Sequence, residues 1–155
     1  MHTMNPESRM WFYGLKTPMS AAQTEELRGI MDEFVGGWKA HGAQLAAAYR
    51  IIADQFLIIA VDESQQQATG CSIDKSVHLL QEFGAKHHLD FFNRMLVHVM
   101  EDGTFTSYST SELKTAIAEG KIGPKTQIMN TTAATLQESG MGTLDLADSW
   151  AAKYL

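Results

Sequence analysis

The spacing of apolar residues along the chain predicts two amphipathic helices. A capping-box pattern at Ser20 and Gln23 is followed by apolar residues that share one helical face, namely Leu27, Ile30, Met31, Phe34, Val35 and Trp38. From Ser72 the helical period returns, with Ile73, Val77, Leu80 and Phe83 or Gly84 on one face. Each helix therefore has one apolar side, which is typical of helices that pack on a sheet.

Shorter segments between and after these helices predict strands. Residues 8–15 are rich in aromatic side chains, and residues 45–53 and 56–61 are two apolar segments joined by a tight turn. The last of these does not alternate, which favours a central strand that is covered on both faces. The elements expected further on are a strand within 90–100, a hairpin at Asp102-Gly103 with a returning strand at 105–108, a capped helix from Ser109 to Gly120, a strand at 126–130 and a short helix at 133–139.

The order of these elements predicts an α+β fold. Its first part reads strand, helix, strand, strand, helix, strand, which is the order of a ferredoxin-like βαββαβ core with a mainly antiparallel sheet. The later hairpin strand and the short C-terminal helices are expected to extend that sheet. A doubly wound parallel sheet is disfavoured because Ala53 to Phe56 leaves no room for a crossover helix. A length of 155 residues suits a single domain over 1–155.

Composition narrows the classes of partner and the compartment. The chain is 45% apolar and 19% charged, and its formal net charge of -6 argues against nucleic acid and anionic membranes as partners. No apolar run approaches the roughly 18 residues that a membrane-spanning helix needs. The lack of an export signal at the start and the single cysteine favour a cytoplasmic protein.

Cys71, the only cysteine, is the candidate catalytic residue. It lies at the predicted start of the second helix, where free backbone N–H groups and the helix dipole favour a thiolate. A thiol-dependent enzyme or a redox sensor is therefore one hypothesis. A structural interpretation stands beside it, in which Ser72 caps the helix, Asp74 complements the dipole and Cys71 is a small buried residue. His78 lies too far along the helix, by about 10 Å of rise, to act as a base for Cys71.

The loop from Gly70 to Ser76 is also a candidate ligand-binding site. Backbone N–H groups at a helix start bind phosphate or carboxylate, so this loop predicts a small anionic ligand. The end of the central strand would line a cleft beside the loop. The candidate ligand-binding residues are Ser72, Asp74, Lys75, Ser76 and Asp62.

Motifs for metals and nucleotides are absent from the sequence. His87 and His88 are consecutive and point in different directions on a helix, and no histidine pair has the spacing of a zinc-binding helix. Thr69 and Asp74 stand where a P-loop needs its two glycines, and the side chains would block close approach of the phosphates. We therefore expect no metal and no cofactor.

Three segments, 4–9, 70–78 and 148–150, resemble a small family of uncharacterised bacterial proteins. Members of that family often bear the label "ABC transporter ATPase". The chain contains neither a P-loop nor the Leu-Ser-Gly-Gly-Gln motif that such an ATPase requires, so ATPase activity is not expected. The resemblance implies one cytoplasmic domain that begins at Met4, with residues 1–3 as an extension.

No complete catalytic constellation occurs in the sequence, so the leading hypothesis is a non-enzymatic accessory domain that binds a small ligand or a protein partner. Trp150 and Tyr154, near the C-terminus, would favour a homodimer if they formed an exposed patch.

Overall fold

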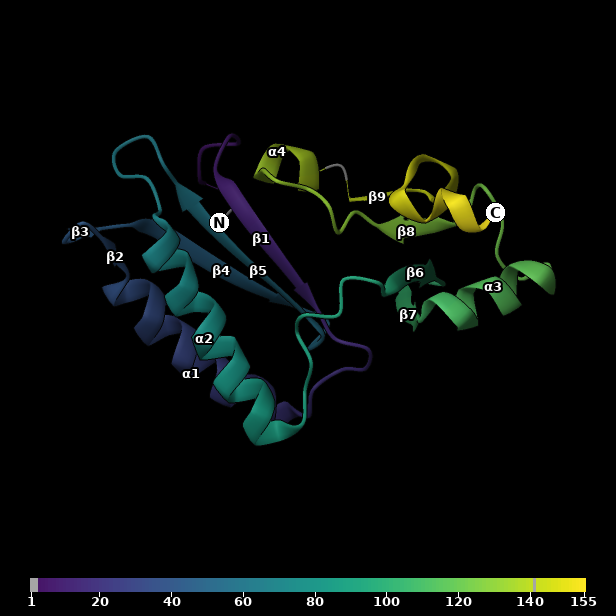
Figure 1. Cartoon of the computed structure of the whole chain (residues 1–155), viewed down its shortest axis with the longest axis horizontal. Coiled ribbons are helices and arrows are strands. Elements are labelled where there is room, and N and C mark those ends of the chain that lie inside the picture. Colours follow the sequence, from purple (N-terminus) through teal and green to yellow (C-terminus); the bar gives the residue numbers. More distant parts are fainter. Residues whose placement is uncertain (1–2, 141) are drawn as a thin grey trace.

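The computed structural model describes residues 3–140 and 142–155, so the first two residues of the expected N-terminal extension lie outside the described residues. A three-stranded antiparallel sheet with the order β1-β5-β4 forms the N-terminal part of the molecule (Figure 1). Its strands are β1 (Arg9–Gly14), β4 (Ala46–Ile52) and β5 (Phe56–Asp62). The central strand β5 is buried along most of its length, which confirms the interpretation of its unbroken apolar run.

Two helices, α1 (Ala21–Gly37) and α2 (Gly70–His87), cover one face of this sheet (Figure 1). The capping box at Ser20 is formed as predicted, because its side chain accepts from the backbone N–H of Gln23 while the Gln23 side chain accepts from the backbone N–H of Ser20. Leu27 and Met31 of α1 are fully buried against the sheet. A short hairpin of β2 (Lys39–Ala40) and β3 (Ala43–Gln44) follows α1 and was not predicted.

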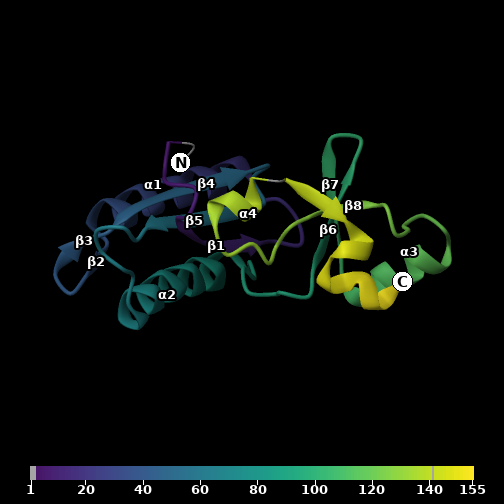
Figure 2. The same cartoon turned by 90° about the horizontal axis from the view of Figure 1, so that it is seen from above.

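A second antiparallel sheet, with the order β7-β6-β8-β9, forms the C-terminal part (Figure 2). Its elements are β6 (Val97–Glu101), β7 (Thr104–Tyr108), α3 (Thr110–Ala118), β8 (Gln127–Met129), α4 (Leu136–Ser139), β9 (Thr143–Asp145) and the 3-10 helices η1 (Leu146–Asp148) and η2 (Trp150–Tyr154). Val99, Leu113, Ile128 and Leu146 form a separate apolar core there. Among the described residues, no helix is both long enough and apolar enough to cross a membrane.

The predicted fourth strand of the first sheet lies elsewhere. Residues 90–96 form a connection, and β6 begins only at Val97 and pairs with β7 and β8 in the second sheet. Three consecutive side chains, Val97, His98 and Val99, are buried, because β6 is a central strand enclosed on both faces. The α+β class is therefore confirmed, whereas the strand order does not confirm the ferredoxin-like core, and the hairpin strand β7 does not extend the first sheet.

The turn between β4 and β5 has an unfavourable residue at its first central position. Ala53 and Asp54 have φ values of 54° and 55°, and the N–H of Gln55 donates to the carbonyl of Ile52 at 3.0 Å. Positive φ values at both central residues of the turn formed by residues 52–55 are typical of a type I′ turn, which asparagine and glycine adopt more readily than alanine.

We expect Ala53→Asn to raise the free energy of unfolding by about 1 kcal/mol, because asparagine tolerates the left-handed conformation that alanine adopts at a cost. Ala53 is exposed, so no packing is lost. Urea unfolding measures the change, with Ala53→Val as a control that should be less stable than the original chain. An Ala53→Asn variant less stable than the original chain would contradict this prediction.

Candidate functional site

The start of α2 is organised around Thr69 rather than Ser72. Thr69 is the N-cap, its side chain accepts from the N–H of Ser72 at 3.2 Å, and the Ser72 hydroxyl oxygen accepts from the N–H of Thr69 at 2.7 Å. The Ser72 hydroxyl also donates to the Thr69 carbonyl at 2.8 Å. The Trp38 indole N–H donates to the Ser72 carbonyl at 2.8 Å, which ties this helix start to the end of α1. Ser72 is thus a buried capping-box residue whose hydroxyl already accepts one hydrogen bond and donates another.

The buried face of α2 is rotated by about one residue from the predicted face. Ser72, Ser76, Leu80, Phe83 and Gly84 are its buried residues, whereas the neighbouring Ile73 and Val77 are only half-buried. The Ser76 hydroxyl donates to the Ile73 carbonyl at 2.6 Å. Both serine hydroxyls thus donate to backbone carbonyl groups of the same helix start.

The other residues of the predicted site are Cys71, Asp74, Lys75 and Asp62, and none of them lines the cavity that is described below. Cys71 is exposed rather than buried, and Asp74 and Lys75 are also exposed. Asp62 accepts from the N–H of Ser64 at 3.0 Å, and this hydrogen bond lowers the pKa of its carboxyl. The Gly70 to Ser76 loop is therefore a capped helix start with an exposed thiol.

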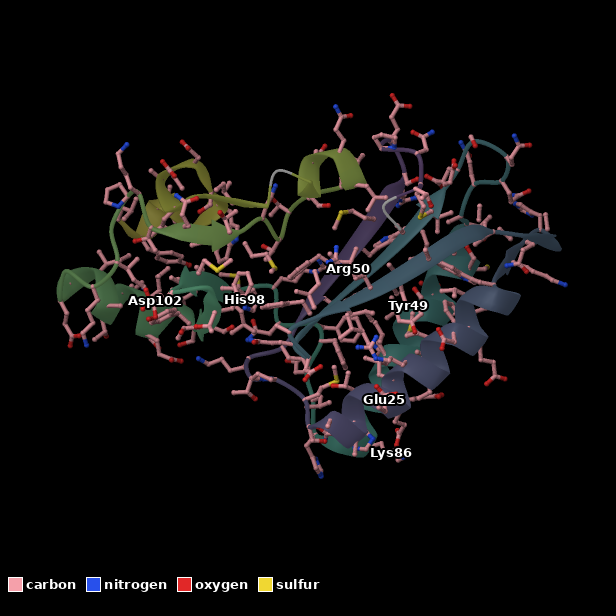
Figure 3. The ribbon with its side chains drawn as sticks, turned by 180° about the vertical axis from the view of Figure 1, so that it is seen from behind. Glu25, Tyr49, Arg50, Lys86, His98 and Asp102 are labelled. Atoms are coloured by element: carbon pink, nitrogen blue, oxygen red, sulfur yellow. The ribbon has the colours of Figure 1, made fainter. Side chains whose placement is uncertain are left out.

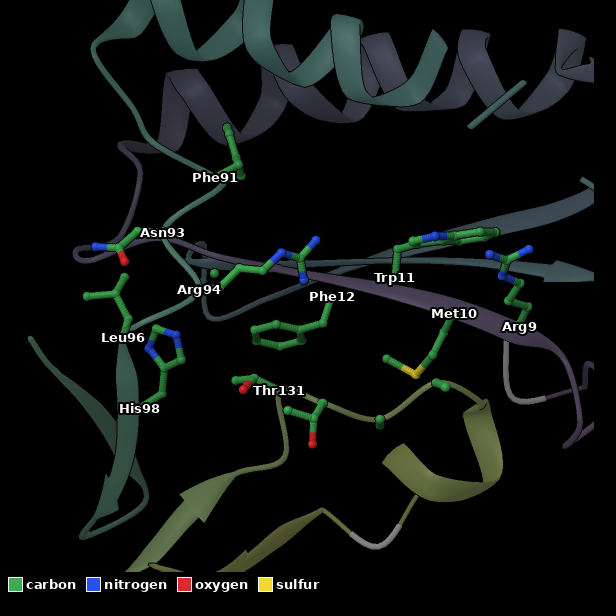
Figure 4. Close-up of a pocket in the computed structure, with 14 residues that line it drawn as sticks. Arg9, Met10, Trp11, Phe12, Phe91, Asn93, Arg94, Leu96, His98 and Thr131 are labelled. Carbon is green, nitrogen blue, oxygen red and sulfur yellow. The ribbon is translucent and has the colours of Figure 1, made fainter. Parts of the chain in front are cut away.

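A cavity of about 440 Å³ lies beside the outer edge of β1, between the two parts of the molecule (Figure 4). We call it the edge cavity. Three segments contribute its walls: β1, the connection that leads into β6, and the segment between β8 and α4. Its lining residues are residues 9–12 and Gly14, then Phe91, Asn93, Arg94, Leu96 and His98, and residues 131–134.

The lining of the edge cavity is basic. Arg9 and Arg94 contribute guanidinium groups, and none of the lining residues is acidic, in a chain with a net charge of -6. Arg9 already has neighbours, because its Nη1 lies 3.9 Å from Glu63 Oε2 and its guanidinium lies 4.8 Å from the centre of the Trp11 ring. The cavity therefore offers positive charge beside an aromatic surface.

Arg94 is the less constrained of the two arginines. It is exposed, and it takes part in no hydrogen bond or ion pair with the residues that the structure describes. Its positive charge reaches β1, since it opposes the rise that burial causes in the pKa of Tyr13. Figure 4 shows the Arg94 side chain extending along the cavity beside Phe12.

The backbone of β1 is open where it faces the cavity. The N–H of Met10 donates to the Ala134 carbonyl at 3.0 Å, away from β5, and the N–H of Leu136 donates to the Ser8 carbonyl at 3.1 Å. Backbone groups alternate in direction along a strand, so those of Phe12 and Gly14 also point away from β5. Within the described part of the chain, the N–H and carbonyl groups of these two residues have no hydrogen-bond partner.

A buried polar network joins the two parts of the molecule beside this cavity. Figure 3 shows one of its members, His98, where the two parts meet. Gln55, after the β4–β5 turn, donates through Nε2 to the Leu15 carbonyl and to the Ser107 hydroxyl oxygen, both at 2.7 Å. The Ser107 oxygen lies 2.6 Å from His98 Nδ1. Gln55, Ser107 and His98 therefore form a continuous chain of hydrogen bonds from the β4–β5 turn to β6.

Gly14 makes room for the His98 ring. A Cβ atom at Gly14 would lie 2.6 Å from His98 Nε2, so the close approach of β1 to this ring requires glycine. His98 is 2% exposed, and burial lowers its pKa to about 4, helped by the nearby charge of Lys16. The imidazole is therefore neutral at pH 7, and the charge of the cavity comes from its arginines.

Sequence reasoning missed the edge cavity, because its residues come from three distant segments. Arg9, Arg94 and His98 belong to no catalytic or ligand-binding motif, and the only local signal is the polar pair Asn93-Arg94 after two aromatic residues. Trp150 and Tyr154, the condition for the predicted homodimer, are both half-buried and pack against the second core.

Groups of three or more residues that could hold a metal ion do not occur among residues 3–140 and 142–155. The features that characterise the edge cavity are therefore its charge, its shape and its open backbone groups.

Comparison of the chain with protein-family models, with curated proteins and with solved structures gives no match.

Proposed function

We propose that the chain is a non-enzymatic binding protein and that an anionic ligand occupies the edge cavity. One observation carries the proposal: two guanidinium groups and no carboxylate line a cavity of about 440 Å³ in an acidic chain. A guanidinium donates two parallel hydrogen bonds to a carboxylate or a phosphate, and this geometry gives both affinity and orientation. Cavities of this size are typical of small-ligand sites.

Arg94 is the residue that would provide most of the binding free energy. Turning it towards a ligand breaks no ion pair with a described residue, whereas Arg9 would share its charge with Glu63. The half-buried rings of Trp11 and Phe12 would contact an apolar part of the ligand. Asn93 and Thr132 are exposed and supply further hydrogen-bonding groups.

We expect Arg94→Glu to weaken the binding of glutarate at least tenfold, because the change removes an attractive charge and introduces a repulsive one. A heteronuclear NMR titration with glutarate measures the affinity through the Phe12 amide in all variants, and through the Arg94 side-chain N–H in those that keep this arginine. Lys39→Glu is the matched control, since it makes the same charge change at an exposed position of β2 that does not line the cavity.

Equal affinity of the Arg94→Glu and Lys39→Glu variants would contradict the proposal. Lys75→Glu separates it from the alternative in which the anion binds the Gly70 to Ser76 loop. We expect Lys75→Glu to bind glutarate as Lys39→Glu does. If only Lys75→Glu loses binding, the anion binds at the start of α2 and not in the edge cavity.

A thiol-dependent role for Cys71 is the second proposal, and the exposure of the thiol is the observation that favours it. An exposed thiol beside the free N–H groups of a first helical turn should react with iodoacetamide faster at pH 7 than the thiol of N-acetylcysteine does. Mass spectrometry of the alkylated chain measures the rate. A rate equal to or below that of N-acetylcysteine would remove this proposal.

A further inference from the structure

We infer that the ligand of the edge cavity is an acidic peptide segment that binds in an extended conformation as an added strand on β1. This inference rests on the proposed function and names the class of its ligand. It starts from the open backbone of Phe12 and Gly14, whose N–H and carbonyl groups point away from β5 into the cavity.

The outer edge of β1 already accepts a strand from this chain. Arg9 forms an antiparallel bridge with Thr135, through the hydrogen bonds of Met10 with Ala134 and of Leu136 with Ser8. This pairing stops at Met10, because residues 131–133 lead away to β8 and become a wall of the cavity. The chain itself thus pairs one half of this edge. In the other half, Phe12 to Gly14, the outward N–H and carbonyl groups have the same direction and spacing, but they have no partner among the described residues.

A peptide satisfies this edge better than a small anion does. Strand pairing needs donors and acceptors that alternate with the spacing of a backbone, and an extended peptide has both on one side. An ionised carboxylate accepts hydrogen bonds but cannot donate to the open carbonyl groups of Phe12 and Gly14, and a small phosphate is too short to supply alternating donors and acceptors along both residues. A buried carbonyl without a donor is unfavourable, so a peptide backbone is the ligand that completes the edge.

The charge of the cavity specifies which peptide fits. Arg94 takes part in no described ion pair, and Arg9 lies on the same edge, so an aspartate, a glutamate or the C-terminal carboxylate of the peptide would meet a guanidinium. The acidic net charge of the whole chain would repel such a peptide elsewhere on the surface. The basic edge therefore gives the site its selectivity for acidic segments.

Selection of phage-displayed random decapeptides on the full chain tests this inference. We expect the selected peptides to be rich in aspartate and glutamate, and a synthetic copy of the best one to bind Arg94→Glu at least tenfold more weakly than Lys39→Glu. Methylation of single backbone nitrogens in that peptide should weaken binding at alternate positions only, by about fivefold or more, because alternate N–H groups of a strand face its neighbour.

Each outcome of this selection decides the inference. If glutarate binds at Arg94 but no selected peptide depends on Arg94, the inference is wrong and the proposed anion site stands. If N-methylation weakens binding at consecutive positions equally, or at none, the peptide does not add as a strand and the inference is also wrong. If neither glutarate nor any peptide depends on Arg94, the proposed function fails together with the inference.

Discussion

The Phe56→Ala variant is expected to lose roughly 3–5 kcal/mol of its free energy of unfolding, as is usual when a fully buried phenylalanine is truncated. Phe56 is completely buried, and its ring connects the two parts of the molecule. The ring centre lies 5.7 Å from that of Phe12 in β1, 4.8 Å from that of His98 in β6 and 5.2 Å from that of Phe105 in β7. Thermal and urea unfolding measure the loss.

The truncation should also change the environment of His98. Water that enters the space left by the ring would restore hydration of the imidazolium, so the pKa of His98 should rise from about 4 towards its ordinary value near 6.5. Phe83→Ala is the matched control, because Phe83 is also buried but contacts Phe91 and His87 within the N-terminal part.

The control should be destabilised by a similar amount while the pKa of His98 stays near 4. NMR titration of the histidine ring follows both variants. A Phe56→Ala variant that loses less than about 1 kcal/mol, or that leaves the pKa of His98 unchanged, would show that this ring does not hold the two parts together.

The second large effect is a dependence of stability on pH that comes from His98. Its pKa is about 4 in the folded chain and about 6.5 when the side chain is hydrated. Between these values the unfolded chain binds a proton that the folded chain does not bind, so stability is complete above pH 6.5 and falls as the pH decreases towards 4. The loss should reach about 3 kcal/mol, at about 1.4 kcal/mol per pH unit.

Urea unfolding of the original chain and of His98→Asn, at several pH values between 4 and 7, measures this contribution. The asparagine variant should show a flatter profile in this range, because it has no imidazole to protonate. His88→Asn is the control, since His88 is exposed and has a φ of 57°, a conformation that asparagine tolerates. Parallel profiles for His98→Asn and the original chain would contradict the assignment.

Local features of the fold could be predicted from the sequence, because their causes are local. The capping boxes at Ser20 and Ser109 start helices, and the Asp102-Gly103 pair forms the expected hairpin, with φ values of 49° and 80°. The unbroken apolar run of β5 identifies a strand enclosed on both faces. Each of these signals lies within a few residues of the element that it specifies.

The arrangement of the two sheets could not be predicted in the same way. The sequence predicts a strand within 90–100, but it does not show that β6 is enclosed on both faces or that its histidine is hydrogen-bonded to Ser107. Only tertiary pairing with β7 and β8 determines this burial. The buried serines of α2 are a second example, because a hydropathy pattern gives Ser72 and Ser76 a polar position.

The candidate site illustrates the same limit. Cys71 is chemically distinctive and lies at a helix start, which predicts a site there, whereas the neighbouring Ser72 and Ser76 hydrogen-bond within the helix and its cap. The edge cavity combines common residues from β1, from the connection before β6 and from the segment before α4, and its open backbone groups have no sequence signal. An unpaired strand edge can be identified only when it is known which strands pair with each other.

The open edge of β1 is tested most directly by amide hydrogen exchange along this strand. We predict alternating behaviour, with slow exchange at Trp11 and Tyr13, which pair with β5, and fast exchange at Phe12 and Gly14, which face the edge cavity. Met10 should exchange slowly, because its N–H donates to Ala134. Protection of Phe12 and Gly14 equal to that of Trp11 and Tyr13 would show that the edge is already paired, and would contradict the addition of a peptide strand to β1.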